Sequence, residues 1–73
     1  MKKLVKLDQN IKDLLNLFNE KEFHKAIKFG KYLLNEHKNV HTLYSILGVC
    51  YLNINDLDES LKYLRKASSL DEN

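Results

Sequence analysis

The chain is poor in the residues that usually interrupt or cross-link a fold. It has no proline, two glycines, one cysteine and one arginine. Without proline, the ends of its elements must be marked by asparagine clusters and by changes in hydrophobic periodicity. A single cysteine, Cys50, excludes an internal disulfide and agrees with a reducing compartment. Neither glycine belongs to a phosphate-binding motif, which excludes a Gly-rich nucleotide site.

Long apolar runs are also missing. No segment approaches the roughly 18 apolar residues of a membrane-spanning helix. The apolar residues near the start are interrupted by Lys6 and followed by Asp8, so the apolar core of a signal peptide is absent. With 73 residues, of which 44% are hydrophobic and 30% charged, the composition is that of one small folded domain. We therefore expect a cytoplasmic protein without a membrane partner.

The net charge of +2 hides an asymmetry between the two halves. Residues 1–40 contain nine lysines and five acidic residues, a balance of +4, whereas residues 41–73 contain three basic and five acidic residues, a balance of −2. Complementary halves would favour head-to-tail association of copies. The simpler interpretation, which we prefer, is that the lysines are solvated on a convex face.

Hydrophobic periodicity predicts four helices, over about residues 8–18, 22–36, 40–52 and 57–69. Asn39 is a good N-cap for the third helix. Asp56, with Glu59 three residues later, forms an Asp-led capping box for the fourth. A shift of 34 residues places Phe23 on Leu57, Ala26 on Ser60 and Asn19 on Asn53. The same helical hairpin is therefore expected twice.

The second half carries the more informative pattern, Tyr44-x-x-Leu47-Gly48-x-x-Tyr51, followed by Ser60, Leu64 and Ala67. This pattern resembles the 34-residue tetratricopeptide repeat, in which an aromatic, a Leu-Gly pair and a Tyr on one helix meet small and large residues on the next. By this resemblance a single domain, residues 1–73, contains repeat 1 at about 7–40 and repeat 2 at about 41–73. It implies an all-α fold, two antiparallel hairpins stacked as a short right-handed solenoid. It also implies that Gly48 and Ser60 form the close contact between the helices of the second hairpin.

The first copy departs from the pattern. Asn10, Asp13 and Leu14 stand at the positions of the aromatic, the Leu and the Gly. Where the second copy has Leu64 and Ala67, the first has Gly30 and Leu33, so large and small residues are exchanged. Such an exchange conserves volume and can keep a core filled. We expect Gly30→Leu to overpack the hairpin.

The residues that could carry chemistry are few. His37 and His41 are four apart, but a helix beginning at Asn39 would separate them, and no cysteine or acidic ligand follows in a fixed pattern. His24 is expected to be exposed. Cys50 stands where these repeats have a small buried residue, and no general base is evident for a catalytic thiol. We expect neither enzymatic activity nor a cofactor or metal.

Nucleic-acid binding is the weaker alternative to protein binding. Lys21, Lys25, Lys28 and Lys31 share one broad helical face and could contact phosphates. Arginine is nearly absent, however, and no aromatic residues alternate with these lysines to stack on bases.

The resemblance places the partner-binding groove on the first helix of each hairpin, with inward residues Ile11, Leu15, Phe18, Ser45, Val49 and Leu52. Members of the family that clamp a C-terminal carboxylate use Lys and Asn at such positions. The apolar residues here disfavour that clamp and favour an amphipathic helix or an extended apolar segment of a protein partner. The alternative is that some of these residues belong to the core.

A second surface is expected on the fourth helix, where a stacking edge would consist of Leu57, Leu61, Leu64 and Leu70. Repeat arrays need about three repeats for good stability, so we expect this edge to be covered by more repeats of a longer array or by another copy in a homo-oligomer. The predicted function is that of a non-catalytic protein–protein interaction module. Its alternatives are a docking arm of a larger enzyme and a self-assembling structural fragment.

Overall fold

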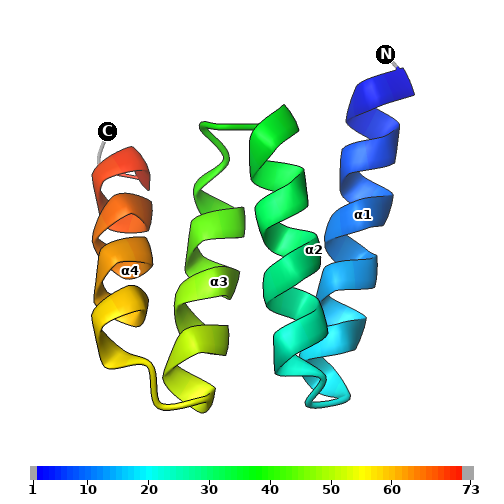
Figure 1. Cartoon of the computed structure of the whole chain (residues 1–73). Helices are drawn as coiled ribbons and strands as arrows, with labels where there is room; N and C mark the ends of the chain where they lie inside the picture. The colour runs from blue at the N-terminus through cyan, green and yellow to red at the C-terminus, as the bar shows by residue number, and fades with distance from the viewer. Residues whose placement is uncertain (1, 72–73) are drawn as a thin grey trace.

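The computed structural model describes residues 2–71, with side chains from residue 7 onward. Its four helices are α1 (Lys2–Asn19), α2 (Phe23–Glu36), α3 (His41–Asn53) and α4 (Leu57–Asp71). They lie side by side in chain order and alternate in direction (Figure 1). Each helix packs against the next one along the chain, and α1 also contacts α3. The predicted all-α fold of two antiparallel hairpins is confirmed.

Both hairpins turn in the same way. The amide of Glu22 donates to the carbonyl of Leu17 at 2.9 Å, and 34 residues later Asp56 donates to Tyr51 at the same distance. The residue before each donor has a left-handed backbone, with φ 63° at Lys21 and 66° at Asn55. A bond spanning five residues with one left-handed residue is the Schellman ending of a helix. The 34-residue period is therefore present in the backbone of the turns.

Two helix starts differ from the prediction. α1 begins at Lys2, not near residue 8, because Lys and Leu are good helix formers and no breaker precedes Asp8. The N-cap of α3 is Val40, and no side chain caps that end, so the capping role predicted for Asn39 is wrong. At α4 half of the predicted capping box is present, since the amide of Glu59 donates to Oδ1 of Asp56 at 3.3 Å. The other half is absent: the amide of Asp56 donates to the carbonyl of Tyr51, and the carboxylate of Glu59 accepts from Lys62.

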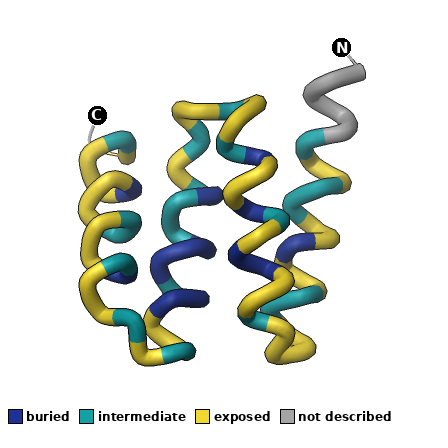
Figure 2. The backbone as a smooth tube through the Cα atoms, viewed as in Figure 1, coloured by how far each residue is buried: buried dark blue, intermediate teal, exposed yellow. Residues whose placement is uncertain are grey.

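The core lies mainly on α3 and on the helix faces turned toward it (Figure 2). Its fully buried large side chains are Leu14, Leu33, Leu43, Leu47 and Cys50. The outer sides of α1, α2 and α4 are exposed. Because burial of apolar surface is the main favourable term in folding, α3 is the helix on which the fold depends most.

Two glycines allow leucines of a facing helix to approach closely. A Cβ added at Gly48 would lie 2.5 Å from Cδ2 and 2.6 Å from Cγ of Leu64. The hydroxyl of Ser60, which is buried, donates to the carbonyl of Gly48 at 2.8 Å. The close contact predicted between Gly48 and Ser60 is confirmed. At Gly30 the equivalent Cβ would lie 2.9 Å from Cδ2 of Leu47, so this glycine receives a side chain of the next hairpin.

The first helices of the two hairpins differ in their outer faces. In α3 the face turned toward α2 is apolar and buried, with Leu43, Ile46, Leu47 and Cys50. The residues 34 positions earlier in α1 are Gln9, Lys12, Asp13 and Asn16, all exposed. The side-chain amide of Gln9 donates to Asp13 at 3.1 Å on this face. α1 therefore presents to solvent a polar surface where α3 presents a core surface.

Candidate partner-binding groove

A shallow groove of about 260 Å³ lies between α1 and α3. Its lining consists of Leu15 and Phe18 from α1 and of Ser45, Ile46 and Val49 from α3. These residues recur at i, i+3 and i, i+4 spacings, which place them on one face of each helix. Ser45 supplies the one polar side chain of the lining, so the groove offers apolar contact and a single hydroxyl.

Four of the six residues predicted for the groove line it together. The other two lie elsewhere: Ile11 packs at the edge of the hydrophobic core, and Leu52 is 48% exposed outside the lining. The groove also includes Ile46, which is not among the six predicted residues. Its position three residues before Val49 is the signal that could have identified it.

The predicted stacking edge on α4 divides into two pairs. Leu57 and Leu61 are 58% and 52% exposed. Leu64 and Leu70 are half-buried, and Leu64 packs on Gly48 of its own hairpin. Beside Leu64, a hollow of about 320 Å³ is lined by Ala67, Ser68 and Asp71 of α4 and by His41 and Ser45 of α3. Ser45 thus lines both this hollow and the α1–α3 groove.

The two tyrosines of the repeat pattern, Tyr44 and Tyr51 of α3, pack with Tyr63 of α4. Tyr63 stacks on Tyr51 with ring centroids 5.4 Å apart and lies 6.1 Å from Tyr44. The ammonium group of Lys31 lies 5.7 Å from the centroid of Tyr51, and the tyrosine hydroxyl raises the pKa of this lysine. Lys31 is therefore engaged with the protein itself.

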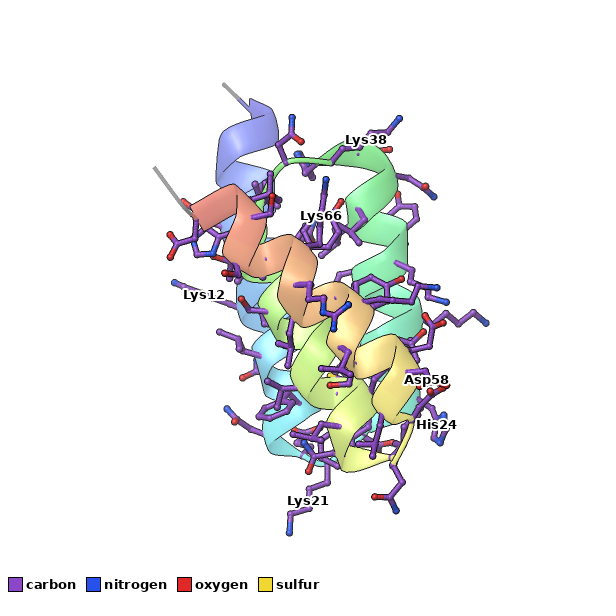
Figure 3. The ribbon with its side chains drawn as sticks, turned by 90° about the vertical axis from the view of Figure 1, so that its left-hand side faces the viewer. Lys12, Lys21, His24, Lys38, Asp58 and Lys66 are labelled. Carbon is purple, nitrogen blue, oxygen red and sulfur yellow. The ribbon has the colours of Figure 1, made fainter. Side chains whose placement is uncertain are left out.

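The lysine stripe proposed for nucleic acid is shorter than expected. Lys21 lies in the turn before α2, and its side chain points away from the helices at the foot of the molecule (Figure 3). Lys25, Lys28 and Lys31 remain exposed on α2, and the ammonium group of Lys31 lies over the ring of Tyr51.

The thiol of Cys50 is fully buried, and this burial raises its pKa to about 11. A thiol with a raised pKa is a poor nucleophile at neutral pH.

His41 forms a 3.6 Å pair with Asp71 across the α3–α4 hairpin. Within the described residues, no three side chains of the types His, Cys, Asp and Glu come close enough together to hold a metal ion. None of the described helices is both long and apolar enough to span a membrane.

Paired helices that repeat at 34 residues, with a glycine at each close contact, define a class of helical-hairpin repeat protein. Residues 41–73, which are 33 of the 73 residues, match the family model described as tetratricopeptide repeat, so the second hairpin is similar to that family. Residues 2–40 form the same kind of hairpin but lie outside the match. Tetratricopeptide repeats are in general protein–protein interaction modules and are typically non-catalytic. No curated protein and no solved structure matches the chain.

Proposed function

We propose that the chain binds a protein partner through the α1–α3 groove, which takes the apolar face of an amphipathic helix. The observation that supports this most directly is the lining, where Leu15, Phe18, Ile46 and Val49 surround one serine hydroxyl. Leu15 is 39% exposed, so part of this apolar surface remains open to solvent. Burial of such surface yields roughly 25 cal/mol per Å².

The size of the groove favours side chains of a protein over a free small molecule. Its volume of about 260 Å³ is below the roughly 300–1,000 Å³ of typical small-molecule sites. A helix presents apolar residues at i, i+3, i+4 and i+7, and its ridge fits the space between two neighbouring helices. An extended apolar segment is the alternative ligand.

The charge around the groove gives the partner a second property. Lys12 points outward on the side of α1 in Figure 3, one turn from Leu15 and Asn16. An amphipathic helix with acidic residues beside its apolar stripe would complement the excess of lysine in the first hairpin.

Fluorescence anisotropy with labelled peptides tests this function. The probe is a helical peptide of about 15 residues with leucines at i, i+3, i+4 and i+7 and glutamates beside them; its control has the same composition with the leucines dispersed. We expect the first peptide alone to bind the wild-type chain. Leu15→Glu and Val49→Glu should each weaken binding at least about tenfold, since a charge would enter an apolar contact.

Tyr32→Glu is the matched control, because Tyr32 is 58% exposed on α2 and outside the groove. Helicity of all variants is checked by circular dichroism. Equal binding of both peptides, or binding that both groove variants retain, would contradict the proposal. Capture from a native lysate with the same variants then identifies the natural partner: proteins lost with both groove variants and kept with Tyr32→Glu are the candidates.

A further inference from the structure

The open face of α4 carries an apolar stripe with a hollow at its far end. Leu57, Leu61, Leu64 and Ser68 recur at spacings of four, three and four residues, which places them along one side of the helix. Leu57 and Leu61 are more than half exposed. Ser68 lies at the hollow of about 320 Å³, about three helical turns from Leu57.

In the first hairpin, the residue equivalent to Leu61 is covered by a neighbouring helix. Ile27 of α2 is the residue 34 positions before Leu61, and it is 8% exposed because α3 packs over it. In the described part of the chain α4 packs on α3, and no other helix covers Leu61, which is 52% exposed. Figure 3 looks onto α4 with α3 behind it, and no other described helix lies in front of α4.

We propose that two copies of the chain pair through antiparallel α4 helices about a twofold axis, with Leu57 of each copy seated in the hollow beside Ser68 of the other. In an antiparallel pair, the start of one helix meets the end of its partner. The exposed Leu57 is therefore brought to the hollow, and Leu61 is brought to Leu64. The small side chains of Ala67 and Ser68 leave space for a leucine, Leu64 supplies an apolar wall, and His41, Ser45 and Asp71 form the polar part of the lining.

The order of charges along α4 supports this orientation. Its N-terminal part and cap carry Asp56, Asp58 and Glu59, and the following turns carry Lys62, Arg65 and Lys66. The last residue of α4, Asp71, is acidic again and lies 3.6 Å from His41 of the same copy. An antiparallel arrangement places the acidic part of one copy against the basic part of the other. Asp58 and Arg65 are exposed, seven residues apart and on the same flank of the stripe, so each meets the other across the axis.

A head-to-tail arrangement is disfavoured by α1. To continue the stack, α1 of a second copy would have to cover the stripe with the face that α3 uses on α2. That face of α1 is polar, with Lys12, Asp13 and Asn16 exposed. Covering Leu61 with it would bury charged groups against an apolar stripe, which is unfavourable.

Sedimentation equilibrium measures the pairing. A contact of one helix per copy is smaller than the roughly 1,600 Å² of a standard interface, so we expect a weak dimer, resolved between about 1 µM and 1 mM. Leu61→Glu should raise the dissociation constant at least about tenfold. Asp58→Arg and Arg65→Asp should each weaken pairing, and the double variant should restore it, because the swapped charges meet again across the axis. Lys25→Asp on α2 is the charge control and should leave the mass unchanged.

Disulfide trapping tests the orientation. Leu57→Cys together with Ser68→Cys should form a covalent dimer under mild oxidation, and either substitution alone should not. The buried thiol of Cys50, with its raised pKa, does not compete. A monomer at every concentration, a Leu61→Glu variant of unchanged mass, or cross-linking of Leu57→Cys alone would overturn the proposal. Val49→Glu should weaken peptide binding but leave the dimer intact. The pairing proposal and the groove proposal can therefore fail independently of each other.

Discussion

The two glycines stand at different positions of the 34-residue period, and they also differ in which atoms of a facing leucine they contact. Gly48 faces both Cδ2 and Cγ of Leu64, and a Cβ there would also lie 3.3 Å from the backbone nitrogen of that leucine. Within 3.3 Å, a Cβ at Gly30 would meet atoms of the Leu47 side chain alone. A side chain can shift more easily than a helix backbone, so the contact at Gly48 is the stricter of the two.

We expect Gly48→Ala to lower the free energy of unfolding by about 1–3 kcal/mol, because Leu64 and its helix must move. Gly30→Ala should have a smaller effect: both substitutions gain roughly 1 kcal/mol in helix propensity, but at Gly30 the contact is with the side chain of Leu47, which can shift more easily than a helix backbone. Gly30→Leu should be clearly destabilising. Urea denaturation followed by circular dichroism measures all three, and a stabilising Gly30→Leu would refute the account of this contact.

These contacts show which single residues can be predicted from a pattern. Gly48 and Ser60 were identifiable because a repeat pattern reserves small residues for the helix crossing. The exchange of large and small residues at Gly30 and Leu33 was visible too. Its partner was not, because the leucine that meets Gly30 comes from the next hairpin and no local spacing connects the two.

Helix ends follow backbone geometry more closely than they follow the best capping side chain. Both Schellman turns have the same hydrogen bonds, although their left-handed residues are Lys21 in one and Asn55 in the other. α3 begins at His41 after Val40, without a side-chain cap, despite the asparagine just before it. α4 begins after Asp56, which does cap it.

The substitutions Asp56→Ala and Asn39→Ala separate these two helix starts. Asp56→Ala should cost about 1 kcal/mol of stability, the typical value for loss of an N-cap. Asn39→Ala should change stability by less than about 0.5 kcal/mol, as expected for an exposed surface position. Equal losses in chemical denaturation would show that Asn39 caps α3 in solution.

Helix existence was predictable and helix boundaries were less so. Four helices follow from the apolar periodicity, and three of the four have ends within two residues of the prediction. α1 was predicted too short, although Leu4 and Leu7 continue the apolar spacing of Ile11, Leu14 and Phe18 back to the first turn. This spacing was the signal that could have placed the start of the helix correctly.

The molecule as a whole has two unlike flanks. The outer face of α1 is polar over residues 9–16, while α4 exposes Leu57 and Leu61. A repeat stack extends when the apolar face of one hairpin is covered by an apolar face of the next. In the described structure α4 has such an apolar face, whereas the outer face of α1 is polar.

Making the α1 face resemble that of α3 should change the assembly. Asp13→Leu combined with Asn16→Leu introduces apolar residues at the positions equivalent to Leu47 and Cys50. We expect species larger than a dimer that grow with concentration, because a head-to-tail contact becomes available. Static light scattering measures this growth. Asp13→Ser with Asn16→Ser is the control and should keep the wild-type mass.

The groove was predicted in outline because its residues follow from the position of α1 and α3 in a hairpin stack. The assignment of Leu52 and Ile11 depended on how the helices rotate, which the sequence pattern does not determine. The hollow beside Ser68 was not predicted at all. The hollow arises because three small side chains meet there, Ala67 and Ser68 from α4 and Ser45 from α3. A local sequence pattern does not bring residues of two helices together.

Ser45 lines both the groove and the hollow. Under the two proposals, the bound peptide and the partner copy would therefore both lie against Ser45. Any factor by which peptide binding changed the pairing constant would then equal the factor by which pairing changed the peptide affinity, because thermodynamic linkage is reciprocal. Ser45 would be one residue through which such coupling passes.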